Sequence, residues 1–326
     1  MTHPLEAFEH RRRPGRRIQG ISAVLLPFDD EGRIDEVAFR THARRTLDAG
    51  LRLAVNMDTG YIDLLTGAEK RRVLDWTREI VGGKDWFAAG ALPAEGAERA
   101  GIAYARECSE ISQAGGVPVI FPSARIAPLD DDGLVSLFGE VAAAAPRFLA
   151  FELGSVFNPY GRMFSERILR TLMDLPACCG LKHSSLDRAT ELQRLELRGE
   201  VRPDFAIYTG NDLAADMVEY GSDYLLGLST FCPELFAARD AAWANQDARY
   251  LELRDMIQYL GWIGFREPVP AYRHSAAIFL KLTGGLESDQ PHPRAPRREP
   301  WDHEALKDAA RRLKDIVPIP IRSISL

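Results

Sequence analysis

A rhythm of short apolar runs, each followed by a segment with helical periodicity, repeats eight times between residues 20 and 243. The runs are almost continuously apolar, as parallel strands buried on both faces are. Eight strand–helix units favour closure into a barrel over an open, doubly wound sheet. The sequence therefore predicts an α/β protein, a (β/α)8 TIM barrel with a C-terminal helical extension.

The predicted boundaries divide the chain into an N-terminal arm (1–19), the barrel (20–243) and a helical appendage packed on it (244–326). The expected strands are 20–28, 51–57, 86–91, 117–121, 147–153, 178–182, 204–208 and 223–228. The expected barrel helices are 35–49, a helix opened by Thr66 with Glu69 as its capping box, 98–113, 131–144, 165–174, 187–198, 212–220 and 233–243. Three further helices are expected at 246–262, 272–283 and 302–315.

The composition excludes several kinds of partner. The chain has 326 residues and a formal net charge of −6, whereas a nucleic-acid-binding protein needs a basic face. The arginine-rich segment 11–17 precedes the first strand, so we expect a solvated tail or an oligomer contact there. No apolar stretch reaches the ~18 residues of a membrane span, and no secretory signal opens the chain.

The cysteine pattern indicates a reducing compartment, so we expect a cytoplasmic protein. The chain has four cysteines, and the adjacent Cys178 and Cys179 would point to opposite faces of a strand. We therefore interpret them as core residues and not as a disulfide or a metal pair. No zinc-like spacing and no GxGxxG at a βα turn occur, so neither metal nor nucleotide cofactor is expected.

Lys182 is the most informative residue for function. In barrel enzymes the active site lies at the C-terminal ends of the strands, and Lys182 ends an apolar strand there. A poorly hydrated lysine has a lowered pKa, and its neutral amine can attack a carbonyl group to form an imine. The alternative is a lysine paired with a carboxylate, with a structural or ligand-orienting role.

Four segments, in order, resemble the dihydrodipicolinate synthase and N-acetylneuraminate lyase family of class I Schiff-base aldolases. They are GISAVLLPFDDEGRID, the DTG at 58–60 followed by LLTGAEKRRVL, GLKHSSLD, and YTGNDLAADMVEYGSDYLLGLSTFCPELF. The resemblance extends from about Gly20 to Ala242. It implies that Lys182 is the Schiff-base lysine, that no cofactor is needed, and that the protein is a homo-oligomer (a dimer or tetramer).

The departures from the family pattern concern its hydroxyl proton relay. The family loop has two adjacent threonines, one for a keto acid's carboxylate and one for the relay; here they correspond to Asp58 and Thr59. The family's strand-5 tyrosine corresponds to Phe151 or, one residue along, Glu152. Because Asp58 would repel a carboxylate, we expect the substrate to be a neutral or hydroxylated carbonyl compound. We also expect that the protein is not a true dihydrodipicolinate synthase.

These departures make Glu152 and Asp58 the candidate proton shuttles beside Lys182. Strand alternation allows only one of Phe151 and Glu152 to face the barrel axis, and the other alternative places Glu152 in the helix layer, bonded to an arginine. His183 is expected to point outward. The candidate substrate-binding residues are Thr59, Gly60, Phe151, Tyr160, Asn211 and Ser229.

Some of these assignments have structural alternatives. Tyr160 could fold over the mouth in place of the missing tyrosine or pack in its loop. Asn211 and Asp212 could cap the next helix or line the pocket. Arg266 and Arg273 of the appendage could reach the mouth or remain on the surface.

The sequence thus favours a lyase or aldolase that acts on a small carbonyl or keto-acid substrate through a Schiff base on Lys182. Two alternatives remain open. One is an imine-forming dehydratase or decarboxylase of a sugar-derived keto acid, and the other is a non-catalytic relative that binds a small metabolite.

Overall fold

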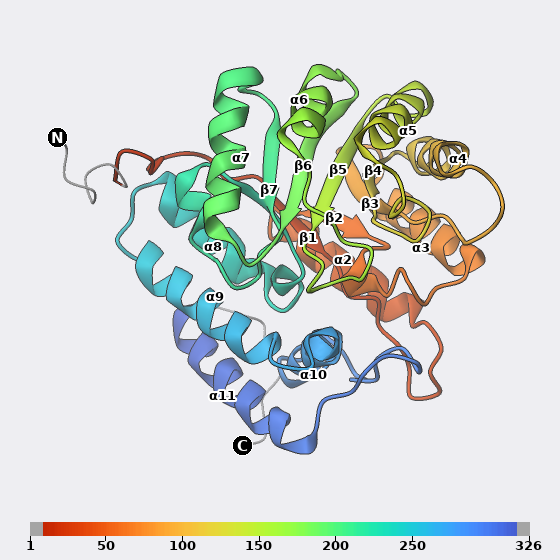
Figure 1. Cartoon of the computed structure of the whole chain (residues 1–326). Helices are drawn as coiled ribbons and strands as arrows, with labels where there is room; N and C mark the ends of the chain where they lie inside the picture. Colours follow the sequence, from red (N-terminus) through yellow and green to blue (C-terminus); the bar gives the residue numbers. More distant parts are fainter. Residues whose placement is uncertain (1–8, 318–326) are drawn as a thin grey trace.

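The computed structural model describes residues 9–317, so the ends of the expected N-terminal arm and of the expected appendage (1–8 and 318–326) lie outside the described residues. Eight parallel strands pair in chain order, and the last pairs with the first to close a barrel (Figure 1). This confirms the predicted TIM barrel. The strands are β1 (Gly20–Ala23), β2 (Arg52–Val55), β3 (Phe87–Ala91), β4 (Gly116–Ile120), β5 (Phe148–Leu153), β6 (Cys178–Ser184), β7 (Ala206–Thr209) and β8 (Asp223–Leu226).

Helices surround the barrel, and each lies close to its expected range except after β7. Thr66 and Glu69 form the predicted capping box at the start of α3. Asp187 caps α7 by accepting from the backbone N–H groups of Ala189 and Thr190. The helices are α2 (Glu36–Asp48), α3 (Gly67–Val81), α4 (Ala100–Gln113), α5 (Asp131–Ala144), α6 (Glu166–Asp174), α7 (Arg188–Val201) and α8 (Pro233–Ala244).

The predicted helix at 212–220 is wrong. Within it, only Met217–Tyr220 forms a short 3-10 helix. The Ala215 carbonyl accepts a hydrogen bond of 3.0 Å from the buried Arg239 side chain, and the Asp212 carboxylate accepts from a backbone N–H after β8. The bond to Ala215 occupies a backbone carbonyl that a regular helix would use in its own ladder, and the segment is a loop at the barrel mouth.

The strands alternate between two apolar clusters. On β5, Leu149, Phe151 and Leu153 belong to the cluster that fills the barrel, whereas Phe148 and Ala150 belong to the larger cluster under the helices. This parity decides which side chains of β5 can reach the mouth from inside.

The arginine-rich segment is not a free tail, because two of its arginines pair with carboxylates of the chain's own barrel. Arg12 forms an ion pair of 2.9 Å with the buried Glu219, and Arg16 one of 2.6 Å with Asp223 at the start of β8. The carboxylates that bind these arginines are far along the chain, which is why local composition did not reveal them.

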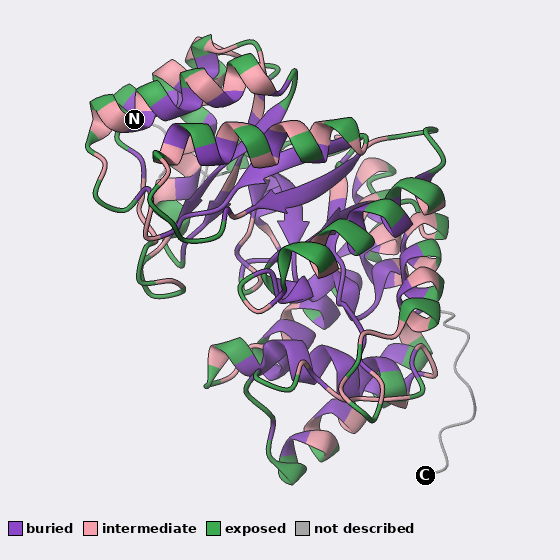
Figure 2. Ribbon diagram, turned by 90° about the vertical axis from the view of Figure 1, so that its right-hand side faces the viewer, coloured by how far each residue is buried: buried purple, intermediate pink, exposed green. Residues whose placement is uncertain are grey.

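The appendage consists of α9 (Tyr250–Gly264), α10 (Tyr272–Leu282) and α11 (Pro300–Ile316), which pack on one another. Figure 2 shows them as a separate layer beside the barrel, with buried residues where the two parts meet. In α9, a Cβ added to Gly261 would lie 2.7 Å from the Asp212 carbonyl oxygen, so this helix touches the loop after β7 directly. Among the described residues, no helix is long and apolar enough to cross a membrane.

Candidate active site

Strand β6 brings Lys182 to the mouth of the barrel. Its neighbour Leu181 belongs to the cluster under the helices, so Lys182 faces the interior. The Nζ atom donates a hydrogen bond of 2.7 Å to the Ser184 hydroxyl and lies 4.1 Å from the centre of the Phe151 ring. A Cβ at Gly210 would come within 2.7 Å of this amine, so glycine at that position leaves the room that Lys182 occupies.

Burial lowers the pKa of Lys182, and this effect outweighs the attraction of Asp212 and Asp58, which favours the charged form. The cause is the loss of water around an ammonium group that has an aromatic ring on one side. A larger share of Lys182 is therefore neutral near pH 7 than for a lysine on the surface. A neutral amine is the form that attacks carbonyl carbons.

Asp212 is the carboxylate most closely coupled to Lys182, and the sequence reasoning treated it only as a possible cap or pocket residue. Its Oδ1 accepts a hydrogen bond of 2.7 Å from the backbone N–H of Leu228. Burial raises the pKa of Asp212, and this outweighs the stabilisation of the carboxylate by Leu228 and by the Lys182 charge. The charge of each of these two groups therefore affects the pKa of the other.

Tyr272, the first residue of α10, is the residue that the sequence reasoning missed. Its hydroxyl lies 2.8 Å from the Thr59 Oγ1 and donates a hydrogen bond of 2.9 Å to the Asp58 Oδ2. Burial and the Asp58 charge raise its pKa, so the phenol remains protonated. Tyr272 and Thr59 are 213 positions apart in the sequence, and no local pattern signals such a contact.

The loop after β2 places Asp58, Thr59 and Gly60 in a short 3-10 helix at the mouth, as the strand-end argument predicted. Thr59 and Gly60 are buried, whereas the Asp58 side chain is 58% exposed. Arg273 of α10 does reach this loop, where it pairs with Asp63 at 3.2 Å. The positive charge of Arg273 is therefore already engaged by a carboxylate.

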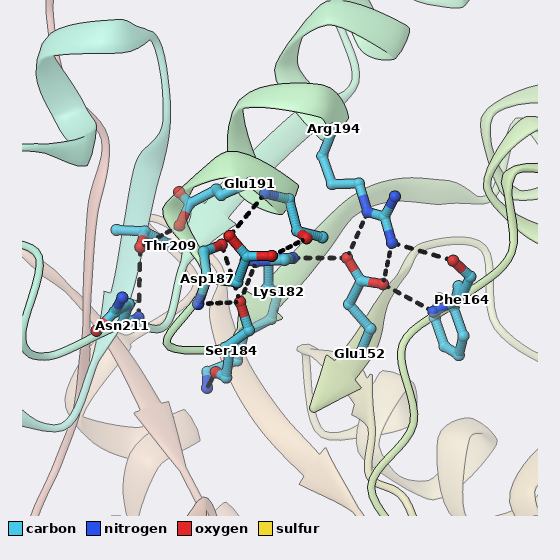
Figure 3. Close-up of polar contacts among 12 residues, drawn as sticks. Glu152, Phe164, Lys182, Ser184, Asp187, Glu191, Arg194, Thr209 and Asn211 are labelled. Atoms are coloured by element: carbon cyan, nitrogen blue, oxygen red, sulfur yellow. Dashed lines mark hydrogen bonds and ion pairs between the residues drawn. The ribbon is translucent and has the colours of Figure 1, made fainter. Parts of the chain in front are cut away.

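Of the two placements left open for Glu152, the structure has the one in the helix layer, bonded to an arginine, so Glu152 does not face Lys182 as a proton shuttle would have to. The Glu152 carboxylate accepts hydrogen bonds from Arg194 at 2.9 and 3.1 Å and from the backbone N–H of Phe164 at 2.9 Å (Figure 3). It also lies 2.6 Å from the Nδ1 of His183, which points outward as expected. Phe151 occupies the inward position, because alternation admits only one of the two.

Burial opposes the ionisation of Glu152, but its hydrogen bonds to His183 and Arg194 outweigh burial and hold its pKa below the usual range. Glu152 is therefore a permanently charged member of a buried network. Ser185 extends this network, since its hydroxyl lies 2.9 Å from the Nε2 of His183. By strand alternation, Glu152 and His183 lie on the side of the barrel wall opposite to Lys182.

The other candidate substrate-binding residues have different surroundings. Tyr160 lies in the loop after β5 and is 40% exposed. The Asn211 side chain accepts from the Leu213 backbone N–H at 3.0 Å and so shapes the loop after β7. The buried Ser229 hydroxyl donates to that of Ser22 at 2.9 Å.

No family model matches the chain. A 4-hydroxy-tetrahydrodipicolinate synthase of Parasynechococcus marenigrum is 28% identical over 285 residues, which are 85% of this chain and 89% of the relative. Among solved structures, a dihydrodipicolinate synthase of Thermotoga maritima superposes with a TM-score of 0.77 at 19% identity, covering 92% of this chain and 99% of the other.

A 2-keto-3-deoxygluconate aldolase of Sulfolobus sulfataricus superposes with a TM-score of 0.75 at 16% identity, over 92% of this chain and 99% of the other. At these identities the solved structures show a shared fold, and the curated relatives add a likeness in sequence along most of the chain. With the barrel and the lysine at the end of β6, these findings show that the chain is a divergent relative of the 4-hydroxy-tetrahydrodipicolinate synthases, which it resembles in sequence and in fold.

Proposed function

We propose that this protein is a lyase that forms an imine between Lys182 and the carbonyl carbon of a small substrate. The observation that carries the proposal is the inward amine at the end of β6, poorly hydrated and bonded to the Ser184 hydroxyl. The likeness of the chain to 4-hydroxy-tetrahydrodipicolinate synthases supports the lyase class. The Glu152 carboxylate accepts hydrogen bonds from an arginine and from a backbone N–H group, as a charge with a structural role does. Lys182 has no such set of partners among the described residues.

The chemistry follows from a neutral amine. Lys182 adds to the carbonyl carbon to give a carbinolamine, which loses its hydroxyl group as water and becomes a protonated imine. A bond next to the imine carbon then breaks, and its electron pair moves into the imine to form an enamine. Protonation of the enamine carbon and addition of water release the product and restore the amine. Asp212 is the group placed to exchange a proton with Lys182 during these steps.

The charges at the mouth support a neutral or hydroxylated carbonyl compound as substrate. Asp58 and Asp212 both act on Lys182, and an additional carboxylate on the substrate would meet two negative groups there. Arg273 pairs with Asp63 at 3.2 Å and with Asp58 at 3.9 Å, so its one positive charge is shared between two carboxylates. We therefore expect hydroxyacetone to be a better imine-forming probe than pyruvate.

Borohydride trapping tests the proposal. The protein is incubated with hydroxyacetone or with pyruvate, reduced with borohydride, digested and analysed by mass spectrometry. We expect covalent mass on the peptide that contains Lys182, and more of it with hydroxyacetone. Absence of adduct with both probes would overturn the imine proposal and favour a non-catalytic binding protein, and product analysis of the trapped compound separates an aldolase from a dehydratase or decarboxylase.

We also propose that the protein functions as a homo-oligomer in the cytoplasm. All four cysteines are free, which suits a reducing compartment. Trp262 and Trp301 of the appendage are 63% and 62% exposed, and aromatic residues are enriched at protein interfaces. Neither proposal alters the chemistry at Lys182.

A further inference from the structure

Three oxygen atoms form a continuous path at the barrel mouth. The Thr59 hydroxyl, the Tyr272 phenol and the Asp58 carboxylate are joined by hydrogen bonds of 2.8 and 2.9 Å. Thr59 and Asp58 are neighbours in the loop after β2, but the phenol between them comes from α10 of the appendage. No hydroxyl from β4 or β5 takes part in this path.

The path connects the interior of the barrel with water. Thr59 is 2% exposed, Tyr272 is 5% exposed, and the Asp58 side chain is 58% exposed. The Tyr272 hydroxyl donates to the carboxylate, so the Thr59 hydroxyl is left to donate to the phenol oxygen. Each donor therefore points outward, and each oxygen can pass its proton to the next.

The same groups act on one another electrostatically. The negative charges of Asp212 and Asp58 raise the pKa of Lys182, and the same two charges raise the pKa of Tyr272. The path therefore belongs to one polar cluster with the amine, although three different segments of the chain contribute to it.

The surroundings of Tyr272 fix the position of its hydroxyl. Its ring stacks on that of Phe265, with 4.3 Å between centroids and 14° between planes. On the barrel side, a Cβ at Gly227 would lie 3.0 Å from the Tyr272 ring and 3.0 Å from the Thr59 hydroxyl, so glycine permits this close approach. A phenol confined on two sides is suited to repeated proton transfer in one geometry.

We propose that Thr59, Tyr272 and Asp58 form a proton wire that carries protons between the imine site and bulk water. This inference rests on the proposed function, because imine formation and enamine protonation both require protons to enter and leave the barrel. A proton released in the site passes from Thr59 to Tyr272 as Tyr272 passes its own to Asp58, which exchanges with water. Uptake reverses the sequence, with no net change in the three groups. In this role Tyr272 and Asp58 are relay residues that need not touch the substrate.

Deuterium uptake measures this transfer directly. An enzyme-bound enamine acquires deuterium from D2O at the carbon next to the carbonyl, and NMR follows its appearance in hydroxyacetone or pyruvate, whichever borohydride traps on the wild-type protein. We expect Tyr272→Phe and Asp58→Asn each to slow uptake by about 10- to 100-fold, in the lower range for a proton-transfer group, while trapping at Lys182 persists. The double variant should be no slower than the slower single variant, because one interruption already breaks the wire.

Tyr259→Phe is the matched control, since Tyr259 of α9 also donates to an aspartate, Asp308 at 2.6 Å, but lies outside the mouth. Its uptake should equal that of the wild type. Normal uptake in both single variants, or losses that multiply in the double variant, would overturn the wire. If Tyr272→Phe fails to fold, the uptake rate of Asp58→Asn alone tests the wire, because the Asp58 side chain is exposed. Absence of trapping on the wild-type protein is a failure of the proposed function itself, and the wire falls with it.

Discussion

The two faces of β6 carry two polar clusters that differ in how completely their charges are satisfied. On the outer face, His183 of β6 contacts Glu152 of β5, which is fully buried and accepts hydrogen bonds from Arg194 and Phe164. On the inner face, Lys182 has one hydrogen bond to a neutral hydroxyl among the described residues. The clusters are one residue apart along the strand, yet the pKa of Glu152 favours its charge and that of Lys182 opposes it.

The difference separates structural charge from reactive charge. A buried ion that is surrounded by partners is held in one protonation state and contributes to the packing of strand on helix. A buried ion with few partners can change its protonation state near neutral pH, which a nucleophile or a proton-transfer group requires. By this criterion Asp212, which accepts from backbone N–H groups and has a raised pKa, resembles Lys182 more than Glu152.

The largest effect is expected from Lys182→Met. Removal of the amine should reduce deuterium uptake by about 1,000-fold or more, because no imine can form. The free energy of unfolding, measured by urea denaturation, should stay within about 1 kcal/mol of wild type or rise, because an apolar side chain needs no hydration there. Retained uptake in this variant would place the chemistry elsewhere.

The opposite pattern is expected from Glu152→Gln. Loss of the charge leaves Arg194 without its buried partner, which should lower the free energy of unfolding by about 3 kcal/mol. Trapping at Lys182 should persist wherever the variant remains folded. Glu36→Gln is the matched control, because Glu36 is exposed and pairs with Arg40 on the surface, and it should cost less than about 1 kcal/mol. Equal losses of unfolding free energy in the two variants would contradict the structural role assigned to the buried Glu152.

The smallest effect is expected from Asp212→Asn, which should shift the pH dependence of the trapping rate. The negative charge of Asp212 raises the pKa of Lys182, so its removal lowers that pKa further. Because the neutral amine reacts, the rise of the trapping rate with pH should move to lower pH. The rate of cyanoborohydride trapping, measured at a series of pH values, reports this shift. A shift to higher pH would contradict the assigned coupling.

The barrel and its lysine were accessible from sequence because both depend on local patterns. Hydrophobic periodicity predicts the alternation of strand and helix, and Lys182 lies at the end of a clear apolar run. The direction of Glu152 was not accessible, since a shift of one residue in strand pairing exchanges the two faces. Tyr272 was missed because its role arises only when α10 docks on the barrel.

Gly261 shows what this docking implies for the history of the protein. A side chain larger than hydrogen at that position would press on the backbone that carries Asp212. A helix taken from a relative to replace α9 would therefore need a glycine at the same position, or the loop that carries Asp212 would have to shift. We expect the barrel and the appendage to be inherited together. Variation in sequence at the barrel mouth should be accompanied by variation in the C-terminal helices.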